Sequence, residues 1–249
     1  MLKNLGIVQA CFHSPRFRCN AARRFGGCSL LEWVIRRVTD AMRLDGVIVV
    51  ACETEDYCEV RRLVPSDVPI YFGQGEDALA RLTKALEEFP ADGVVRVRGD
   101  NLFVDPGLID RLITTAEAHP HCDYVSYCSR DGQPAILSPV TAYAEWFRSA
   151  ALRKVNRLAR GKNDREQITR YIYSHPEKFN LRLIPAPAGI DREDVRLTVD
   201  IEEDWDHAQA IYEALGSEQF DWQRIAELLS HQPALRSRMA TLNRVHAHA

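Results

Sequence analysis

Two aspartates far apart in the chain are the first residues that could do chemistry. Asp100 closes the run VVRVRGD, and Asp200 closes RLTVD. If both runs are strands of one parallel sheet, both carboxylates reach the edge where such sheets bind ligands. Carboxylate oxygens suit Mg²⁺, which completes its shell with water and phosphate oxygens. The pair therefore predicts a Mg²⁺ site.

Helix capping is the alternative explanation for these aspartates. Asp200 begins an Asp-x-x-Glu spacing at 200–203, which is that of a capping box, so cap and ligand fit it equally. The next helix after Asp100 already has a suitable cap in Asp105, which is followed by Pro106. Asp100 is therefore the better candidate for a metal ligand.

An apolar strand followed by an Arg-rich loop, a glycine pair and an amphipathic helix opens the chain, over residues 6–36. This order is common where α/β proteins bind anions. Ser14, Arg16 and Arg18 lie in the loop, and guanidinium groups match phosphate geometry. A solvated polar loop is the alternative.

Two further segments carry groups suited to binding. In GQGEDALARL (73–82), Gly73 and Gly75 permit close backbone approach and acidic residues start a helix, although an ordinary strand-to-helix turn has the same features. In NDREQITRYIYSHPEKF (163–179), Arg165 and Arg170 share a helix face, for which a solvated charged surface is the default interpretation.

The composition limits the classes of function. The 249 residues are 46% hydrophobic, and 32 basic against 35 acidic side chains give a net charge of −3, so no overall cationic field favours nucleic acid or anionic membrane. No segment has the roughly 18 apolar residues of a membrane span, and the N-terminal apolar run is too short for a signal peptide. Seven cysteines without a C-x-x-C pair indicate reduced thiols. We therefore expect a cytoplasmic protein.

Strand and helix patterns alternate along the first half of the chain. We expect strands over 5–10, 45–53, 68–73, 92–100 and 122–129, and helices over 29–42, 55–64, 76–89 and 105–119. In the second half we expect extended segments over 134–143, 179–188 and 196–200, and helices over 144–160, 164–175 and 201–215, before a helical tail. Alternation of this kind predicts an α/β fold with a mostly parallel central sheet flanked by helices. We expect one domain over 1–249, with a smaller sub-domain inserted around 130–190.

Taken together, the segments resemble the cytidylyltransferases that activate acidic sugars, most closely the branch named after spore-coat polysaccharide biosynthesis protein F. The similar segments are IVQA, GGCSLLEWVI, YFGQGEDALARL, VVRVRGDNLFVDPGLID, DREQITRYIY with HPEKF, and RLTVDIEEDW. The resemblance implies a GT-A-like (Rossmann-like) nucleotidyltransferase fold. It also implies that CMP passes from CTP to a sugar or sugar-like acid with release of pyrophosphate, that Mg²⁺ is the cofactor, and that the second-half sub-domain binds the acceptor and forms a homodimer.

The resemblance also implies roles for individual residues. Catalysis would fall to Asp100, Asp200 and Arg16, with both aspartates on the metal. The acceptor would contact Arg165, Glu166 and Gln167. The nucleotide would contact Gln9, Ala10, Ser14, Arg16, Gly73, Gly75, Glu76, Asp77 and Arg98.

The opening loop departs from the pattern of the family. Cys11 stands in place of an Arg and Asn20 in place of a Lys, while Arg18 replaces a Pro and Cys19 a Gly. Gln167 stands where relatives often have His. Two other functions therefore stay open. One is a catalytically impaired homologue that binds nucleotide or a partner without turnover. The other is a GT-A-type glycosyltransferase, although GDN at 99–101 keeps only the first carboxylate of the D-x-D motif usual in that class.

Overall fold

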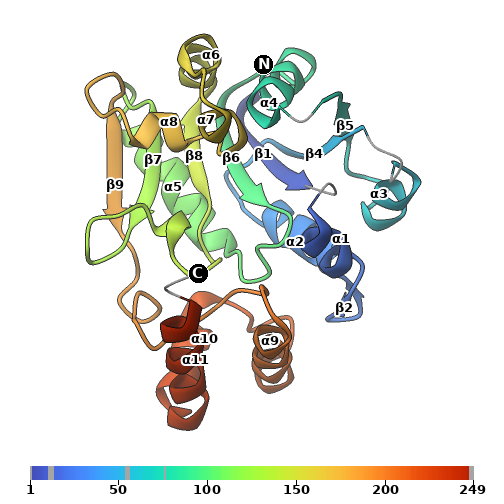
Figure 1. Cartoon of the computed structure of the whole chain (residues 1–249), viewed down its shortest axis with the longest axis vertical. Coiled ribbons are helices and arrows are strands. Elements are labelled where there is room, and N and C mark those ends of the chain that lie inside the picture. The colour runs from blue at the N-terminus through green and yellow to red at the C-terminus, as the bar shows by residue number, and fades with distance from the viewer. Residues whose placement is uncertain (1, 11–13, 54–56, 76, 247–249) are drawn as a thin grey trace.

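The computed structural model describes residues 2–10, 14–53, 57–75 and 77–246, apart from the side chains of Pro15 and Arg16. Seven strands form one sheet in the order β5-β4-β1-β6-β8-β7-β9, and β8 alone among them runs antiparallel to its neighbours (Figure 1). The strands of this sheet are β1 (Leu2–Ala10), β4 (Gly46–Cys52), β5 (Ile70–Gly73), β6 (Ala91–Arg98), β7 (Tyr124–Cys128), β8 (Glu145–Arg148) and β9 (Leu181–Pro185). A separate two-stranded hairpin consists of β2 (Arg24–Phe25) and β3 (Cys28–Ser29).

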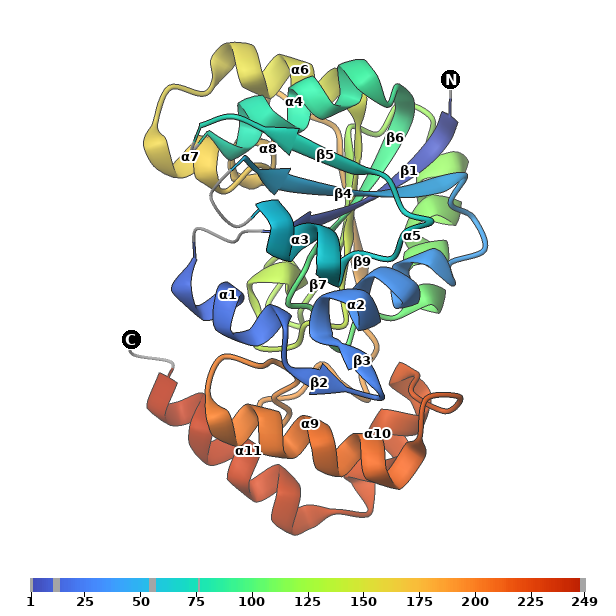
Figure 2. The ribbon, with the colours of Figure 1, turned by 90° about the vertical axis from the view of Figure 1, so that its right-hand side faces the viewer.

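Helices cover both faces of the sheet. Figure 2 shows α4 and α6 on one side and α2 and α5 on the other. The helices are α1 (Pro15–Ala21), α2 (Leu30–Thr39), α3 (Tyr57–Leu63), α4 (Ala78–Glu88), α5 (Pro106–Ala118), α6 (Ser149–Leu158), α7 (Lys162–Glu166), α8 (Arg170–Tyr173), α9 (Glu202–Leu215), α10 (Trp222–Ser230) and α11 (Pro233–His246), with a 3₁₀ turn at Ala135–Leu137. Within the described ranges, no helix is long and apolar enough for a membrane span.

Strand β1 shows why the central strands are apolar throughout. Leu5 and Ile7 belong to the core beneath α4 and α6, whereas Val8 and Ala10 belong to the core beneath α2 and α5. Because successive side chains of a strand alternate between the faces, a sheet covered on both sides needs apolar residues at both sets of positions.

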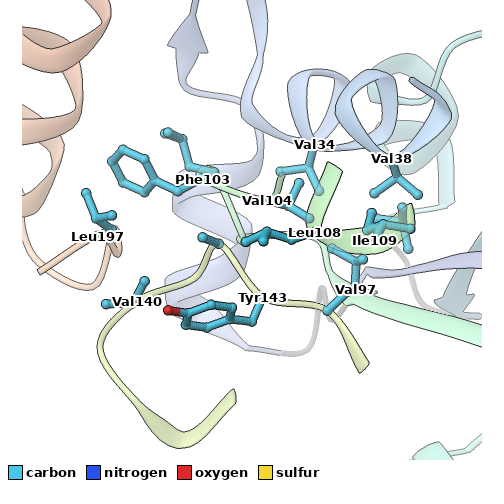
Figure 3. Packing of buried hydrophobic residues seen from close by; sticks show 14 of the residues in the cluster. Val34, Val38, Val97, Phe103, Val104, Leu108, Ile109, Val140, Tyr143 and Leu197 are labelled. Carbon is cyan, nitrogen blue, oxygen red and sulfur yellow. The ribbon is translucent and has the colours of Figure 1, made fainter. Parts of the chain in front are cut away.

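The larger core continues beyond the end of β6. Figure 3 shows Val97 of β6 packed near Val34 and Val38 of α2, with Phe103, Val140 and Leu197 farther along the same cluster. All of these side chains are buried. The segment that leads to Asp200 is therefore anchored in the core beside the loop that follows Asp100.

The helices α9, α10 and α11 gather beneath the hairpin β2–β3 (Figure 2). Phe25 of the hairpin contacts the rings of Trp33, Trp205, Tyr212 and Phe220, with centroids 4.9 to 6.0 Å apart. Edge-on and tilted contacts of this kind are favourable aromatic geometries. The opening segment and the C-terminal helices thus share one aromatic cluster.

The expected α/β architecture is confirmed, while several local expectations are wrong. The helix expected over 164–175 is two short helices, so Arg165 on α7 and Arg170 on α8 do not share one helix face, and the extended segment expected over 134–143 contains the 3₁₀ turn. Residues 15–21 form a short helix within the expected loop, because Ser14 accepts a hydrogen bond from the amide of Phe17 as its N-cap. Residues 145–148 form a strand rather than the start of a helix, because the sheet buries Glu145, Trp146 and Phe147 on its two faces. The run 196–200 pairs only through a single bridge between Leu197 and Val140.

Candidate active site

Asp100 lies just past the carboxyl end of β6, beside the end of β1. The amide of Gly99 donates to the carbonyl of Gln9 at 2.9 Å, which holds the turn against β1. The Asp100 side chain is only 11% exposed and receives two hydrogen bonds from Arg98, Nε to Oδ1 at 3.0 Å and Nη2 to Oδ2 at 2.6 Å. Arg98 itself is 49% exposed. The predicted position of Asp100 just past the carboxyl end of a parallel strand is confirmed.

Asp200 precedes α9 and is not its cap. The cap is Ile201, and the carboxylate of Asp204 accepts from the amides of Asp200 and Ile201 at 3.0 and 3.3 Å. The alternative that Asp200 caps the helix in a capping box at 200–203 is therefore wrong, because the cap lies one position later. Arg196 forms a buried bidentate pair with Asp204 and lies 3.6 Å from the Asp200 carboxylate.

Helix α1 brings the neighbourhoods of the two aspartates together. The ring of Phe17 lies so close to Gly99 that a Cβ there would come within 2.9 Å of it. One turn later, the side-chain amide Nδ2 of Asn20 donates to the carbonyl of Val199 at 2.9 Å. Side chains three apart on a helix are neighbours, about 5–6 Å between Cβ atoms. Asp100 follows Gly99 and Asp200 follows Val199, so each aspartate comes directly after a residue that contacts this short helix.

The donor set of these two residues fits a hard divalent cation. Two carboxylates from separate segments, open to water on the Asp200 side where 36% of the side chain is exposed, match the few protein ligands that Mg²⁺ takes. Among the described residues, no group of three or more His, Cys, Asp or Glu side chains gathers as a metal site. A Zn²⁺-type centre with three or four protein ligands is thus absent from that part of the chain.

The glycine-containing turn after β5 is rigidly built. Gly75 has φ +77°, which favours glycine, and its carbonyl accepts from Arg81 Nη1 at 2.7 Å. A Cβ on Gly73 would come within 2.5 Å of the Arg81 side chain. Asp77 caps α4 by accepting from the amide of Ala80 at 2.9 Å. Glu76 lies outside the described residues.

The predicted acceptor segment touches the predicted nucleotide segment directly. Arg165 donates through Nε to Asp77 Oδ2 at 2.5 Å and through its other nitrogens to Asn156 Oδ1 and the carbonyl of Ala159, at 2.8 and 3.0 Å. Glu166, which is 49% exposed, pairs with Lys162 at 3.6 Å. Gln167 is the exposed C-cap of α7. Arg165 therefore joins α4, α6 and α7 at this edge.

Two arginines of the opening segment contact other groups of the protein. Arg23 makes two hydrogen bonds to Glu202, at 2.7 and 2.6 Å, and stacks over Trp205. Arg24 donates to the carbonyl of Gly27. Cys11 and the side chain of Arg16 lie outside the described residues. Arg23 thus joins the opening segment to α9, whereas Arg24 makes its contact within the hairpin β2–β3.

The sequence patterns did not predict a buried polar cluster around Glu145. Glu145 is 1% exposed, pairs with Arg96, and accepts from Tyr124 Oη at 2.7 Å and Thr169 Oγ1 at 2.9 Å. Burial and the nearby carboxylate raise the pKa of Tyr124, which keeps its hydroxyl a donor. Arg96 also donates to Gln9 Oε1 at 2.8 Å. The signal for this cluster in the sequence is an acidic residue directly before two large apolar residues, Trp146 and Phe147.

Comparisons with known proteins show what the chain is similar to. A family model described as Cytidylyltransferase matches residues 5–230. An uncharacterised protein of Methanocaldococcus jannaschii is 28% identical over 237 residues, covering 95% of this chain and 94% of that protein. The spore coat polysaccharide biosynthesis protein SpsF of Bacillus subtilis is 27% identical over 219 residues, covering 85% of this chain and 87% of that protein.

Solved structures with low sequence identity share the fold. A cytidylyltransferase from Leptospira borgpetersenii has a TM-score of 0.83 at 21% identity and covers 94% of this chain and 97% of its own. A CMP:2-keto-3-deoxy-manno-octonic acid synthetase complexed with CTP scores 0.64 at 13% identity, covering 85% and 99%. A Mycobacterium tuberculosis protein complexed with manganese scores 0.58 at 19% identity, covering 84% and 98%. With a family model that spans nearly its whole length, the chain belongs to the cytidylyltransferase family.

Proposed function

We propose that this protein transfers CMP from CTP to a sugar or sugar-like acid, releases pyrophosphate, and requires a divalent metal ion held by Asp100 and Asp200. The observation that carries this proposal is the meeting of both aspartate segments on α1, in a chain of the cytidylyltransferase family. The relative named for spore coat polysaccharide biosynthesis and the structural neighbour that makes a CMP-sugar acid support the acceptor class.

In this reaction an oxygen of the acceptor forms a bond to the α-phosphorus of CTP, and the bond from that phosphorus to the bridging oxygen of pyrophosphate breaks. A bound divalent ion would supply charge stabilisation at the phosphate oxygens. Asp100 and Asp200 would hold that ion, and Mg²⁺ is the ion that two carboxylates with water favour. The manganese complex of a structural neighbour supports a divalent ion in this fold.

The remaining residues would bind and orient. The turn of Gly73 and Gly75, with Asp77, would lie against the nucleotide together with Gln9 and Ala10. Ser14 and Arg16 would face the triphosphate. Arg165 is the link between the two substrates, because its contact with Asp77 fixes the acceptor segment relative to the nucleotide turn.

Pyrophosphate release from CTP tests the proposal. The assay supplies Mg²⁺ and a panel of sugar acids that begins with 2-keto-3-deoxy-manno-octonic acid. We expect acceptor-dependent release that Asp100→Asn lowers by about 10²–10³-fold, the loss typical of removing a group that stabilises transition-state charge. Asp92→Asn is the matched control, because Asp92 is exposed at the opposite end of the same strand.

Two other outcomes would replace the proposal. CTP binding without turnover on any acceptor would indicate a catalytically impaired homologue, consistent with Cys11 and Asn20 in place of two cations. Hydrolysis of a nucleotide-sugar donor, with no release of pyrophosphate from CTP, would indicate a GT-A-type glycosyltransferase.

A further inference from the structure

Arg98 and Asp100 form a bidentate pair whose two members differ sharply in burial. The carboxylate is 11% exposed and accepts through both oxygens, whereas the Arg98 side chain is 49% exposed. A guanidinium fork on both oxygens uses the positions through which the carboxylate would contact a metal ion, and a second cation at that distance is repelled. A metal ligated by Asp100 and the present position of Arg98 therefore compete.

The exposure of Arg98 allows it to give way. Gly99 is the one residue between the partners, and α1 holds this turn through the contact of Phe17 with Gly99. The carboxylate can thus stay in place while the long Arg98 side chain rotates through solvent. Arg98 also lies on the same sheet face as Gln9, because the two residues are paired in register on β6 and β1. A rotated Arg98 remains at the edge where the nucleotide would bind.

Two arginines and one asparagine of the opening segment are held by other groups, so a displaced Arg98 would add to Arg16 at the triphosphate. Arg23 is held by Glu202 and Trp205, Arg24 by the carbonyl of Gly27, and Asn20 by the carbonyl of Val199. A triphosphate needs cations that can turn toward it. Once a metal ion binds the Asp100 carboxylate, the displaced Arg98 guanidinium becomes such a cation.

We propose that Arg98 is an exchangeable cation: it holds Asp100 until a divalent metal ion takes that carboxylate, and it then turns to the triphosphate of the nucleotide. This inference rests on the proposed function, because it requires Asp100 to be a metal ligand. Arg98 then has opposite effects on the affinities for the two ligands. It lowers the affinity for the metal ion and raises the affinity for the nucleotide.

The test is calorimetric titration with Mn²⁺ alone, and then with CTP at saturating Mn²⁺. We expect Arg98→Gln to bind Mn²⁺ at least about threefold tighter than the wild type, and CTP about tenfold more weakly, as expected for the loss of one charge-assisted bond. Arg98→Lys keeps the charge without the fork, so it should bind Mn²⁺ more tightly than the wild type and recover most of the CTP affinity. Arg182→Gln, which removes an exposed arginine of β9, should change neither affinity.

The possible failures are distinguishable. Weaker binding of both ligands by Arg98→Gln would show that Arg98 only orients Asp100, and unchanged binding of both would show that it takes no part, so either result overturns the exchange. If Asp100→Asn binds Mn²⁺ and CTP as the wild type does, Asp100 is not a metal ligand, and the proposed function falls together with the exchange. Retention of the wild-type circular dichroism spectrum by each variant confirms folding.

Discussion

Glu145 is a buried carboxylate that holds side chains from three other elements or loops. It pairs with Arg96 of β6 and accepts hydrogen bonds from Tyr124 of β7 and from Thr169, which precedes α8. Buried charges are tolerated only when they are paired and hydrogen-bonded. Removing Glu145 would leave the Arg96 guanidinium, 14% exposed, without its carboxylate.

We therefore predict that Glu145→Ala lowers the free energy of unfolding by about 3–5 kcal/mol, the usual loss when one partner of a buried pair is removed. Urea denaturation followed by circular dichroism measures it. Glu218→Ala, which removes an exposed glutamate in the loop after α9, should change stability by less than about 0.5 kcal/mol. A small loss in Glu145→Ala would mean that the pair does not organise this part of the sheet.

His207 of α9 makes stability depend on pH. Burial, and secondly Arg238, lower its pKa, while Asp204 and Asp206 act in the opposite direction. Its Nδ1 atom is buried and has no hydrogen-bond partner among the residues that the structure describes. Because the folded pKa lies below the unfolded value of about 6.5, the unfolded chain takes up the proton first. This contribution to stability is complete above about pH 6.5 and is lost as the pH falls toward the folded pKa.

We predict that His207→Gln reduces the loss of stability between about pH 7.5 and pH 5. Urea midpoints measured across this range give the slope for each variant. His121→Gln, at an exposed histidine in the loop before β7, should keep the wild-type slope. An unchanged slope in His207→Gln would assign the acid sensitivity to other groups.

At the scale of elements, α1 is the part on which the site depends most. Its seven residues are too few for a helix to be stable alone, so tertiary contacts hold it. These include the Phe17 ring against Gly99 and the Asn20 side-chain amide on the carbonyl of Val199. Asn20 stands where the family pattern has a Lys. Its hydrogen bond thus connects the opening segment to the Asp200 segment.

We expect Asn20→Ala to speed amide hydrogen exchange across α1 and to cost about 1 kcal/mol of stability, because one tertiary hydrogen bond is lost. Hydrogen exchange with mass spectrometry resolves this segment. The neighbouring Cys19 is exposed, so Cys19→Ala is the matched control and should leave the exchange unchanged. Protection of α1 that persists in Asn20→Ala would show that Phe17 suffices to dock the helix.

The sequence predicted elements where local patterns suffice. The apolar run of β6 and the Asp105–Pro106 signal of α5 placed Asp100 between two elements, and the structure confirms both. The short helix after Ser14 was not predicted, because its arginines favoured a loop. The Glu145 cluster was not predicted either, because Arg96 and Thr169 are distant in sequence. Contacts of this kind depend on the tertiary fold, and the periodic spacing of apolar residues within one segment does not predict them.

At the scale of the whole molecule, one aromatic cluster joins the N-terminal and C-terminal parts of the chain. We therefore expect these two parts to unfold together. Phe25 is 1% exposed and contacts Trp33 on α2, Trp205 and Tyr212 on α9, and Phe220 before α10. The strands β8 and β9, which lie within 130–190, belong to the same sheet as β1. A distinct sub-domain and a homodimer interface in that region stay predictions.

We predict a single unfolding transition, with tryptophan fluorescence and far-ultraviolet circular dichroism giving the same midpoint. Phe25→Ala should lower the free energy of unfolding by about 3–5 kcal/mol, because it leaves a cavity among large rings. Met42 is 88% exposed, so Met42→Ala should leave stability almost unchanged. Separate midpoints in the wild type would contradict the shared cluster.

Asp100 and Asp200 are proposed to hold a divalent ion for CTP, and nucleotide titration measures whether they do. The protein is titrated calorimetrically with each of the four nucleoside triphosphates, with and without Mg²⁺. We expect selective CTP binding that requires Mg²⁺ and that is lost in Asp100→Asn and in Asp200→Asn. Asp92→Asn and Asp206→Asn, whose aspartates are exposed, should keep it. CTP binding that is independent of the metal, or that both active-site variants retain, would contradict the proposal.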